Sequence, residues 1–197
     1  VIDDAPDATS VVALNAGDDS KQAQYSLNLR DERGLGNADV PHRFVFNGTW
    51  DLSYFGSLPG AAKTIINGWQ FSSIVQAQSN FPFSRRLGNL DLTNDGNSFS
   101  DRVPQFGRNT ERLEEIVNVD FRLTKAFQLR ENVQLKFFAE FFNAFNRANR
   151  TSFDGQQFSV TGLGETTTPV FTPRAQFLTP RTVSDPRIGQ LALKLVF

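Results

Sequence analysis

The 197-residue sequence carries a net charge of −1, and its length fits a single domain. This charge excludes the basic surface that nucleic-acid binding requires, so we expect no nucleic-acid partner. The chain has no cysteine and one histidine, which excludes thiol catalysis, disulfides and metal sites built from cysteines or several histidines.

Alternating apolar and polar side chains predict β-strands along much of the chain. The first strand shows the pattern, because Phe44, Phe46 and Trp50 share one face and Arg43 and Asp51 share the other. No apolar run approaches the length of a membrane-spanning helix. The same alternation predicts strands near 42–54, 68–81, 115–127, 132–146 and 188–197.

The fourth of these segments, NVQLKFFAEFFNAFNR, is ambiguous. As a strand it points Val133, Leu135 and Phe137 to one face. Leu135, Phe138 and Phe142 also fit the apolar stripe of a helix. We favour a strand, because aromatic residues are enriched in strands and the neighbouring segments are strands.

The connections between these strands alternate in length. Residues 55–67 and 128–132 are short, whereas 3–41, 81–114 and 147–187 are long and rich in Gly, Asn, Asp, Thr and Pro. A compact soluble domain rarely carries three structureless loops of this length. Outer-membrane barrels do, with short periplasmic turns and long extracellular loops.

Aromatic residues mark the strand ends nearest the short turns. With those turns in the periplasm, Tyr54, Trp69, Phe127 and Phe197 fall at one level, as the aromatic girdle of a membrane barrel does. We therefore predict an all-β fold, an antiparallel curved sheet of about five to six strands that is a fragment of a transmembrane β-barrel. Five to six strands are too few to close into a barrel. We therefore expect an unpaired edge at the strand of 42–54 or at that of 188–197.

Five stretches follow one another along the chain: RDERGLGNADVPHRFVFNGTWDL, GWQFSSIVQAQSNFPF, VNVDFRLTKAF, KFFAEFFNAFNRANRTSF and DPRIGQLALKLVF. In this order they resemble the C-terminal barrel of TonB-dependent outer-membrane receptors, in the branch with a carboxypeptidase-regulatory-like N-terminal domain. The likeness covers residues 3–197 and implies roughly the last five strands of a barrel of about 22. The chain lacks methionine and a signal peptide, so we expect a fragment or a processed product.

The resemblance implies active uptake across the outer membrane of a Gram-negative-type bacterium. In such receptors extracellular loops capture a scarce ligand, a plug domain fills the barrel, and an inner-membrane TonB complex pulls on the plug. The implied partners are outer-membrane lipid, the plug and TonB complex through upstream residues, and a small-molecule, oligosaccharide or peptide ligand. Leu195 and the aromatic Phe197 also resemble the signal that the barrel-assembly machinery recognises.

Charged side chains on the polar faces of the strands are candidate lumen residues. The candidates are Arg43, Asp51, Asp120, Arg122, Lys136, Glu140 and Lys194. These side chains either contact the plug or a passing substrate, or form cross-strand ion pairs that hold the wall in register. We favour ion pairs, because a hairpin of 115–127 and 131–146 brings residues of both signs within a residue or two of one another.

The stretch DLTNDGNSFSDR partly resembles a calcium-binding loop. Asp91, Thr93 and Asp95 occupy its first, third and fifth positions, but Arg102 stands at position twelve, where a bidentate Glu is required. We favour a simple turn, since Asp and Asn beside glycine form turns readily. No acid, base and nucleophile can be assembled elsewhere, so we expect neither catalysis nor a cofactor.

Two alternatives to an active transporter stay open. A passive, porin-like barrel shares every strand-level argument. A soluble β-rich adhesin or carbohydrate-binding module would pack the apolar faces on a second sheet. In the last loop, Arg174, Arg181 and Arg187 are either ligands for an anionic group or solvated charges.

Overall fold

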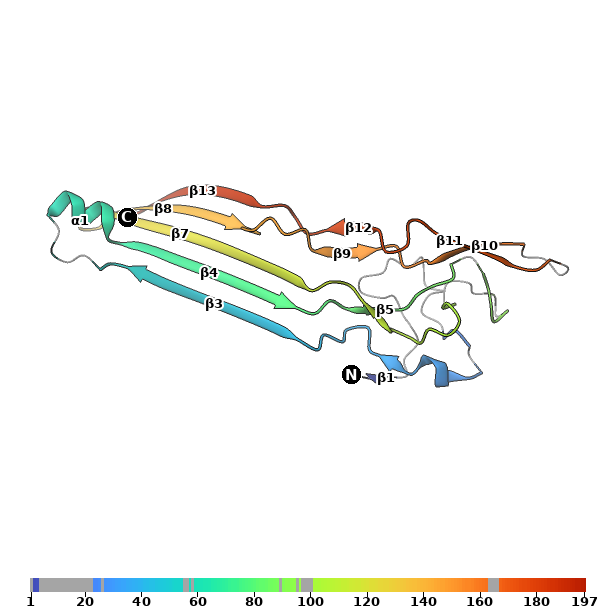
Figure 1. Cartoon of the computed structure of the whole chain (residues 1–197). Coiled ribbons are helices and arrows are strands. Elements are labelled where there is room, and N and C mark those ends of the chain that lie inside the picture. The colour runs from blue at the N-terminus through green and yellow to red at the C-terminus, as the bar shows by residue number, and fades with distance from the viewer. Residues whose placement is uncertain are drawn as a thin grey trace. The chain divides into compact units, whose positions relative to one another are not determined.

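The alternating segments form five long antiparallel strands in the computed structural model (Figure 1). They are β3 (Arg43–Leu52), β4 (Trp69–Gln78), β7 (Ile116–Arg130), β8 (Val133–Phe142) and β13 (Ile188–Val196). Their order across the sheet is β13–β8–β7–β4–β3. The predicted fold class is confirmed, and the ambiguous fourth segment is a strand.

The structure describes residues 2–3, 23–25, 27–54, 57, 59–88, 90–94, 96, 101–162 and 167–197. The chain divides into two compact units. The sheet unit comprises Arg43–Gln78, Ile116–Ala148 and Asp185–Phe197. The loop unit comprises Val1–His42, Ser79–Glu115 and Asn149–Ser184.

Strand ends differ from the expected bounds where turn residues intervene. β8 ends at Phe142 rather than at 146, because Asn143 and Asn146 have φ angles of 46° and 55°. Such left-handed backbone is incompatible with a strand, and asparagine tolerates it better than most residues. β7 instead runs on to Arg130, since residues 131–132 alone make the turn into β8.

The connection from β3 to β4 contains a helix that the alternation did not predict. This helix, α1 (Gly60–Ile66), follows Pro59 and is followed by Asn67 and Gly68. Gly68 has a φ of +75°, the left-handed conformation that commonly terminates helices. No helix in the described part of the chain is long and apolar enough to cross a membrane.

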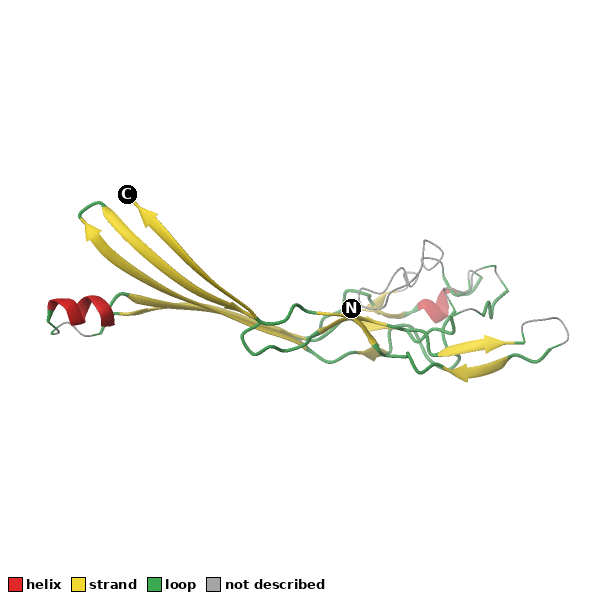
Figure 2. Ribbon diagram, turned by 90° about the horizontal axis from the view of Figure 1, so that it is seen from above, coloured by secondary structure: helices red, strands yellow, loops and turns green. Residues whose placement is uncertain are grey.

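The sheet is open and twisted. Figure 2 shows the strands near the C-terminal label diverging from the pair that carries the helix. β3 and β13 are its two edges, and no strand among the described residues pairs with their outer sides. Both terminal strands therefore have the unpaired edge expected of a sheet too small to close.

The long connections are not structureless, which corrects the expectation for 3–41, 81–114 and 147–187. A 3₁₀-helix, η2 (Leu29–Glu32), lies in the first connection. Short antiparallel pairs complete the loop unit: β1 (Ile2–Asp3) with β2 (Gly34–Leu35), β5 (Pro82–Phe83) with β6 (Glu111–Arg112), β9 (Arg150–Phe153) with β12 (Pro180–Val183), and β10 (Phe158–Thr161) with β11 (Val170–Pro173).

The buried apolar side chains of the described residues lie in the loop unit. The rings of Phe83 and Phe153 pack with centroids 4.2 Å apart. Leu87 and Val160 belong to a second buried cluster. Each cluster joins the second connection to the third, so segments distant in sequence fold together around shared cores.

Candidate functional site

Strand register defines a polar face of the sheet. Directly paired residues of antiparallel strands point to the same side, and successive residues alternate. The pairings place all the predicted lumen residues on one side, the polar face: Arg43, Asp51, Asp120, Arg122, Lys136, Glu140 and Lys194.

One row of the polar face crosses the whole sheet through Thr49, Ser72, Arg122, Glu140 and Gln190. The Glu140 carboxylate accepts hydrogen bonds from the Arg122 guanidinium and from the Gln190 side-chain amide. The hydroxyl oxygens of Thr49 and Ser72 lie 3.2 Å apart. Arg122 and Glu140 thus form a cross-strand ion pair that links β7 to β8.

Lys136 and Lys194 are arranged differently from the other charges. They stand directly opposite each other on β8 and β13. On β7 the cross-strand neighbour of Lys136 is Ala126, and Glu140 lies four residues away on the same strand. The hairpin therefore does not bring Lys136 within a residue or two of an opposite charge. Like charges in this arrangement destabilise a sheet. The cross-strand ion pair that we expected between charged residues of the polar face is therefore not formed between Lys136 and Lys194.

On the opposite side, the apolar face, the large apolar side chains are exposed or half-buried. This face carries Phe44, Phe46, Trp50, Leu52, Trp69, Phe71, Phe121, Leu123, Phe137, Leu191, Leu193 and Leu195. Phe44 is 59% exposed, Leu191 is 73% exposed and Leu193 is 70% exposed. Soluble monomers rarely expose an apolar surface of this extent. A soluble sandwich would need a second sheet here, and the described residues supply none.

The predicted interface aromatics gather near one end of the apolar face. Trp69 begins β4, and Phe127 lies one row beyond it in β7. Tyr54 and Phe197 follow the ends of β3 and β13. The indole Nε1 of Trp50 donates to the Tyr54 hydroxyl. Trp69 and Tyr54 combine large apolar surfaces with polar tips, as residues at a membrane interface do, whereas Phe127 and Phe197 supply apolar surface alone.

Lys125 is a cation on the apolar face that sequence reasoning did not single out. It pairs with Trp69 across β4 and β7 and is 1% exposed. Its ammonium donates to the carbonyl of Asn67 and lies 5.6 Å from the ring centroid of Trp69 and 5.2 Å from that of Phe127. The one signal in the sequence is a break in alternation, because lysine occupies an apolar position of β7.

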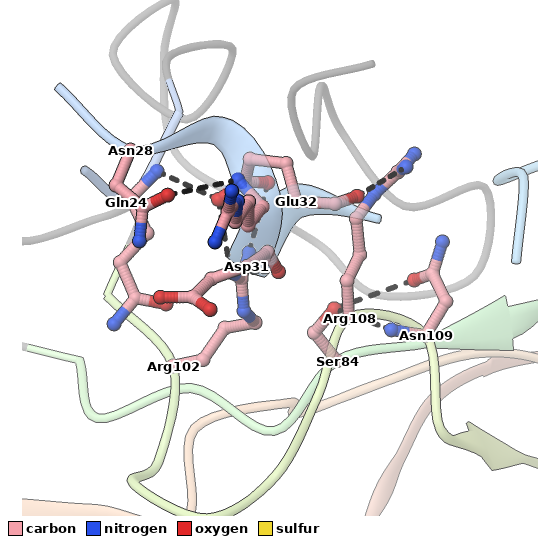
Figure 3. A network of polar contacts seen from close by, with 9 residues as sticks. Gln24, Asn28, Asp31, Glu32, Ser84, Arg102, Arg108 and Asn109 are labelled. Atoms are coloured by element: carbon pink, nitrogen blue, oxygen red, sulfur yellow. Dashed lines mark hydrogen bonds and ion pairs between the residues drawn. The ribbon is translucent and has the colours of Figure 1, made fainter. Parts of the chain in front are cut away.

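A buried ion pair joins the first and second connections of the loop unit (Figure 3). The Glu32 carboxylate accepts hydrogen bonds from the Arg102 guanidinium at 2.9 and 3.1 Å, and both side chains are at most 3% exposed. Glu32 also accepts the backbone N–H of Gln24 at 2.9 Å. The Arg108 guanidinium donates to the Glu32 carbonyl at 3.1 Å.

Asn109 is a second buried link between the same connections. It adopts a φ of 54°, which asparagine accepts more readily than most residues. Its side-chain amide donates to the Leu35 carbonyl at 2.6 Å and to the Asn37 side chain at 2.7 Å. Its backbone N–H donates to the Ser84 hydroxyl at 3.0 Å. These bonds hold the first connection against the second.

A pocket of about 490 Å³ opens beside this network. Arg30 and Arg33 line it from the first connection, and Gln105 and Phe106 line it from the second. Its volume falls within the range of roughly 300–1,000 Å³ that suits small-molecule ligands. Arg85 covers one face of the Phe106 ring at 4.3 Å from its centroid. The pocket combines the exposed guanidinium groups of Arg30 and Arg33 with the exposed Asp31 carboxylate between them in sequence and with an aromatic wall.

The arginines of the last loop are engaged within the chain. Arg174 and Arg181 donate to the same Asp154 oxygen at 3.2 and 2.8 Å. Arg187 donates its backbone N–H to the Asn146 side chain at 2.9 Å. The first two therefore neutralise a carboxylate of their own loop, which favours a structural role for them.

The residues of the candidate calcium loop are only partly described. Asp91 accepts the backbone N–H of Gly96 at 2.7 Å, a bond typical of a turn. Thr93 follows it in the chain, and Asp95 lies outside the described residues. Among the described residues no group of three or more acidic or histidine side chains is arranged to hold a metal ion.

Comparison with known families gives one match. A family model described as "Outer membrane beta barrel domain" matches residues 5–106, slightly more than half of the chain. The matched region includes β3 and β4 of the sheet and the second connection as far as Phe106. No curated protein and no solved structure matches the chain significantly.

Proposed function

The chain belongs to the outer membrane beta barrel domain family, and from this premise we propose that it is the C-terminal part of a TonB-dependent receptor. The family places the protein in a bacterial outer membrane. In this proposal the apolar face contacts lipid and the polar face lines the lumen. The loop unit captures a scarce ligand outside the cell, and energy from the inner membrane drives its passage through a plugged barrel.

The loop unit carries this proposal. Its three connections share two apolar clusters and a buried ion pair, so its surface side chains are held by a folded support. Preorganised side chains bind a dilute ligand with less loss of conformational entropy than flexible loops do. A passive pore selects by channel width and charge and needs no folded pocket of this kind.

The pocket beside η2 is the capture site in this proposal. The guanidinium groups of Arg30 and Arg33 suit a carboxylate or phosphate, because each offers several donors in a planar fork. Phe106 offers a face for an apolar or planar part of the same ligand. An anionic small molecule or the terminal carboxylate of a peptide combines these features.

Lys136 and Lys194, which lie opposite each other on the polar face, support a second proposed contact, one with the plug domain. Two adjacent cations in a wall are stabilised by an anionic partner that enters between them. The plug domain that fills such receptors lies against this wall, so we propose that one of its carboxylates meets Lys136 and Lys194.

Dependence on TonB separates the active transporter from the passive barrel. Strains with and without the full-length receptor would be grown on ferric siderophores, cobalamin, oligosaccharides or peptides as limiting nutrients. We expect a growth advantage on at least one nutrient that disappears when the TonB gene is deleted. A receptor-dependent advantage that persists without TonB would establish the porin-like alternative.

The lysine contact has its own test. K194E creates a cross-strand ion pair with Lys136 and should stabilise the barrel by about 0.2–1 kcal/mol. Uptake should nevertheless fall, because the plug carboxylate then meets a negative charge. Q134E adds the same charge one row away on the polar face and serves as the control. A more stable K194E barrel with unchanged uptake would show that the lysines do not contact the plug.

A further inference from the structure

The connection between β3 and β4 bends to the apolar side of the sheet. Trp69 and Lys125 both leave the sheet on its apolar face. The Trp69 indole N–H donates to the carbonyl of Ile65 at 2.9 Å, and the Lys125 ammonium donates to the carbonyl of Asn67. Because side chains on one face reach these carbonyls, residues 65–67 lie on the same side of the sheet.

The helix in this connection is amphipathic. Successive residues of an α-helix are rotated by about 100°, so Ala62, Ile65 and Ile66 share one side of α1, Thr64 lies on the opposite side, and Lys63 lies on the flank next to Ile66. Ile65 is 65% exposed and Ile66 is 44% exposed. Two large aliphatic side chains at the end of the sheet are thus uncovered within the chain.

We propose that α1 is an interfacial anchor that lies in the head-group region of the membrane and inserts Ile65 and Ile66 among the acyl chains. This inference rests on the orientation in the proposed function, with the apolar face toward lipid, and does not depend on TonB or on a ligand. Lys63, on the flank of the helix, then reaches water and lipid phosphates.

The helix continues the surface that is proposed to face lipid, which favours lipid over a protein as the partner that contacts Ile65 and Ile66. The helix is bonded to Trp69, which lies on the same face as the exposed Leu193 and in the same row across the sheet, through Lys125 and Phe137. A helix of seven residues is also too small for the roughly 1,000 Å² that a specific protein interface buries. Had the connection bent toward the polar face, it would instead have met the lumen.

The anchor also accounts for Lys125. A charge facing acyl chains destabilises a barrel, most strongly at the membrane midplane and less near the interface. Here the connection covers the ammonium, its Asn67 carbonyl accepts a hydrogen bond, and two aromatic rings flank it. The polar N–H groups of Trp69 and Lys125 are therefore both satisfied by the segment that the helix positions.

Site-directed spin labelling of the full-length receptor tests the anchor. Single labels at I65C, T64C, L193C and K194C would be compared in vesicles of phosphatidylethanolamine and phosphatidylglycerol, with any native cysteine upstream replaced. The present chain has none. Collision with oxygen reports acyl chains, and collision with a water-soluble nickel chelate reports water. Folded receptor is selected by its heat-modifiable gel mobility.

We expect the oxygen-to-nickel ratio at I65C to match that at L193C and to exceed the ratios at T64C and K194C. A water-like ratio at I65C beside a lipid-like ratio at L193C would overturn the anchor and leave the barrel orientation intact. Water-like ratios at both positions would overturn the orientation as well. If the label at Ile65 prevents folding, I66C provides the same readout from the same side of the helix.

Discussion

Removing the charge of Glu32 should loosen the loop unit far more than removing a more exposed carboxylate of the same unit. In E32Q the Arg102 guanidinium stays buried without its anionic partner and keeps only neutral acceptors, the Asp31 carbonyl at 3.0 Å and the new side-chain amide oxygen. Breaking a buried ion pair from one side destabilises a protein by about 3–5 kcal/mol. The matched control is E111Q, because the Arg85–Glu111 pair spans 2.9 Å with side chains 23% and 30% exposed. Such a pair contributes at most about 1 kcal/mol.

Hydrogen exchange of the full-length receptor in detergent measures this difference locally. A loss of 3 kcal/mol corresponds to about a hundredfold increase in local opening, since 1.4 kcal/mol is a factor of ten. We expect this increase in peptides covering residues 101–109 of E32Q, and at most about a fivefold increase in E111Q. The double variant E32L/R102L should exchange more slowly than E32Q, because apolar replacement of both partners removes the unpaired buried charge. Equal exchange in E32Q and E111Q would refute the assignment of this pair as the link between the connections.

Two further predictions concern the sheet faces and the close packing of the loop unit. L191R places a charge on the apolar face and should destabilise the barrel in vesicles by about 2–4 kcal/mol. The control A192R, on the polar face, should change the stability by less than about 1 kcal/mol. Equal losses of unfolding free energy in urea titrations would contradict the assignment of the two faces. G34A should destabilise the loop unit by about 1–3 kcal/mol, because a Cβ there would lie 2.6 Å from the Arg108 carbonyl oxygen. In the control G60A the new Cβ meets no atom within 4 Å, and the substitution should stabilise α1 by up to about 1 kcal/mol. Unchanged hydrogen exchange of the loop unit in G34A would refute the close approach of Gly34 to Arg108.

Local pattern predicts the sheet well, because both the faces and one hairpin register are local properties. Period-two alternation assigns each side chain to a face without knowledge of its neighbours. Residues 131–132 form a tight turn, and a turn of fixed length sets the register of the strands that it joins. A β-bulge between Gln128 and Arg130 shifts this register by one residue, so the turn alone would set Arg122 against Phe141. The Arg122–Glu140 pairing follows only when the polar faces of the two strands are matched as well.

The pairing of Lys136 with Lys194 could not be anticipated in this way. Residues 143–187 separate β8 from β13, and a connection of that length imposes no register on the strands. The contents of the loop unit escaped prediction for a related reason. Glu32 and Arg102 lie 70 positions apart, and neither belongs to a periodic segment.

Two features that break the sequence pattern are linked in the structure by the connection between β3 and β4. Lys125 is a charge at an apolar position of a strand, and Ile65 and Ile66 are exposed aliphatic residues in a connection. Each alone violates the pattern of a membrane barrel. Because residues 65–67 lie on the apolar side of the sheet, the connection supplies the carbonyl that the lysine needs, and in the proposed anchor its isoleucines face lipid. Loss of this connection would therefore uncover a cation within an apolar wall, so the lysine in the strand depends on the segment that covers it.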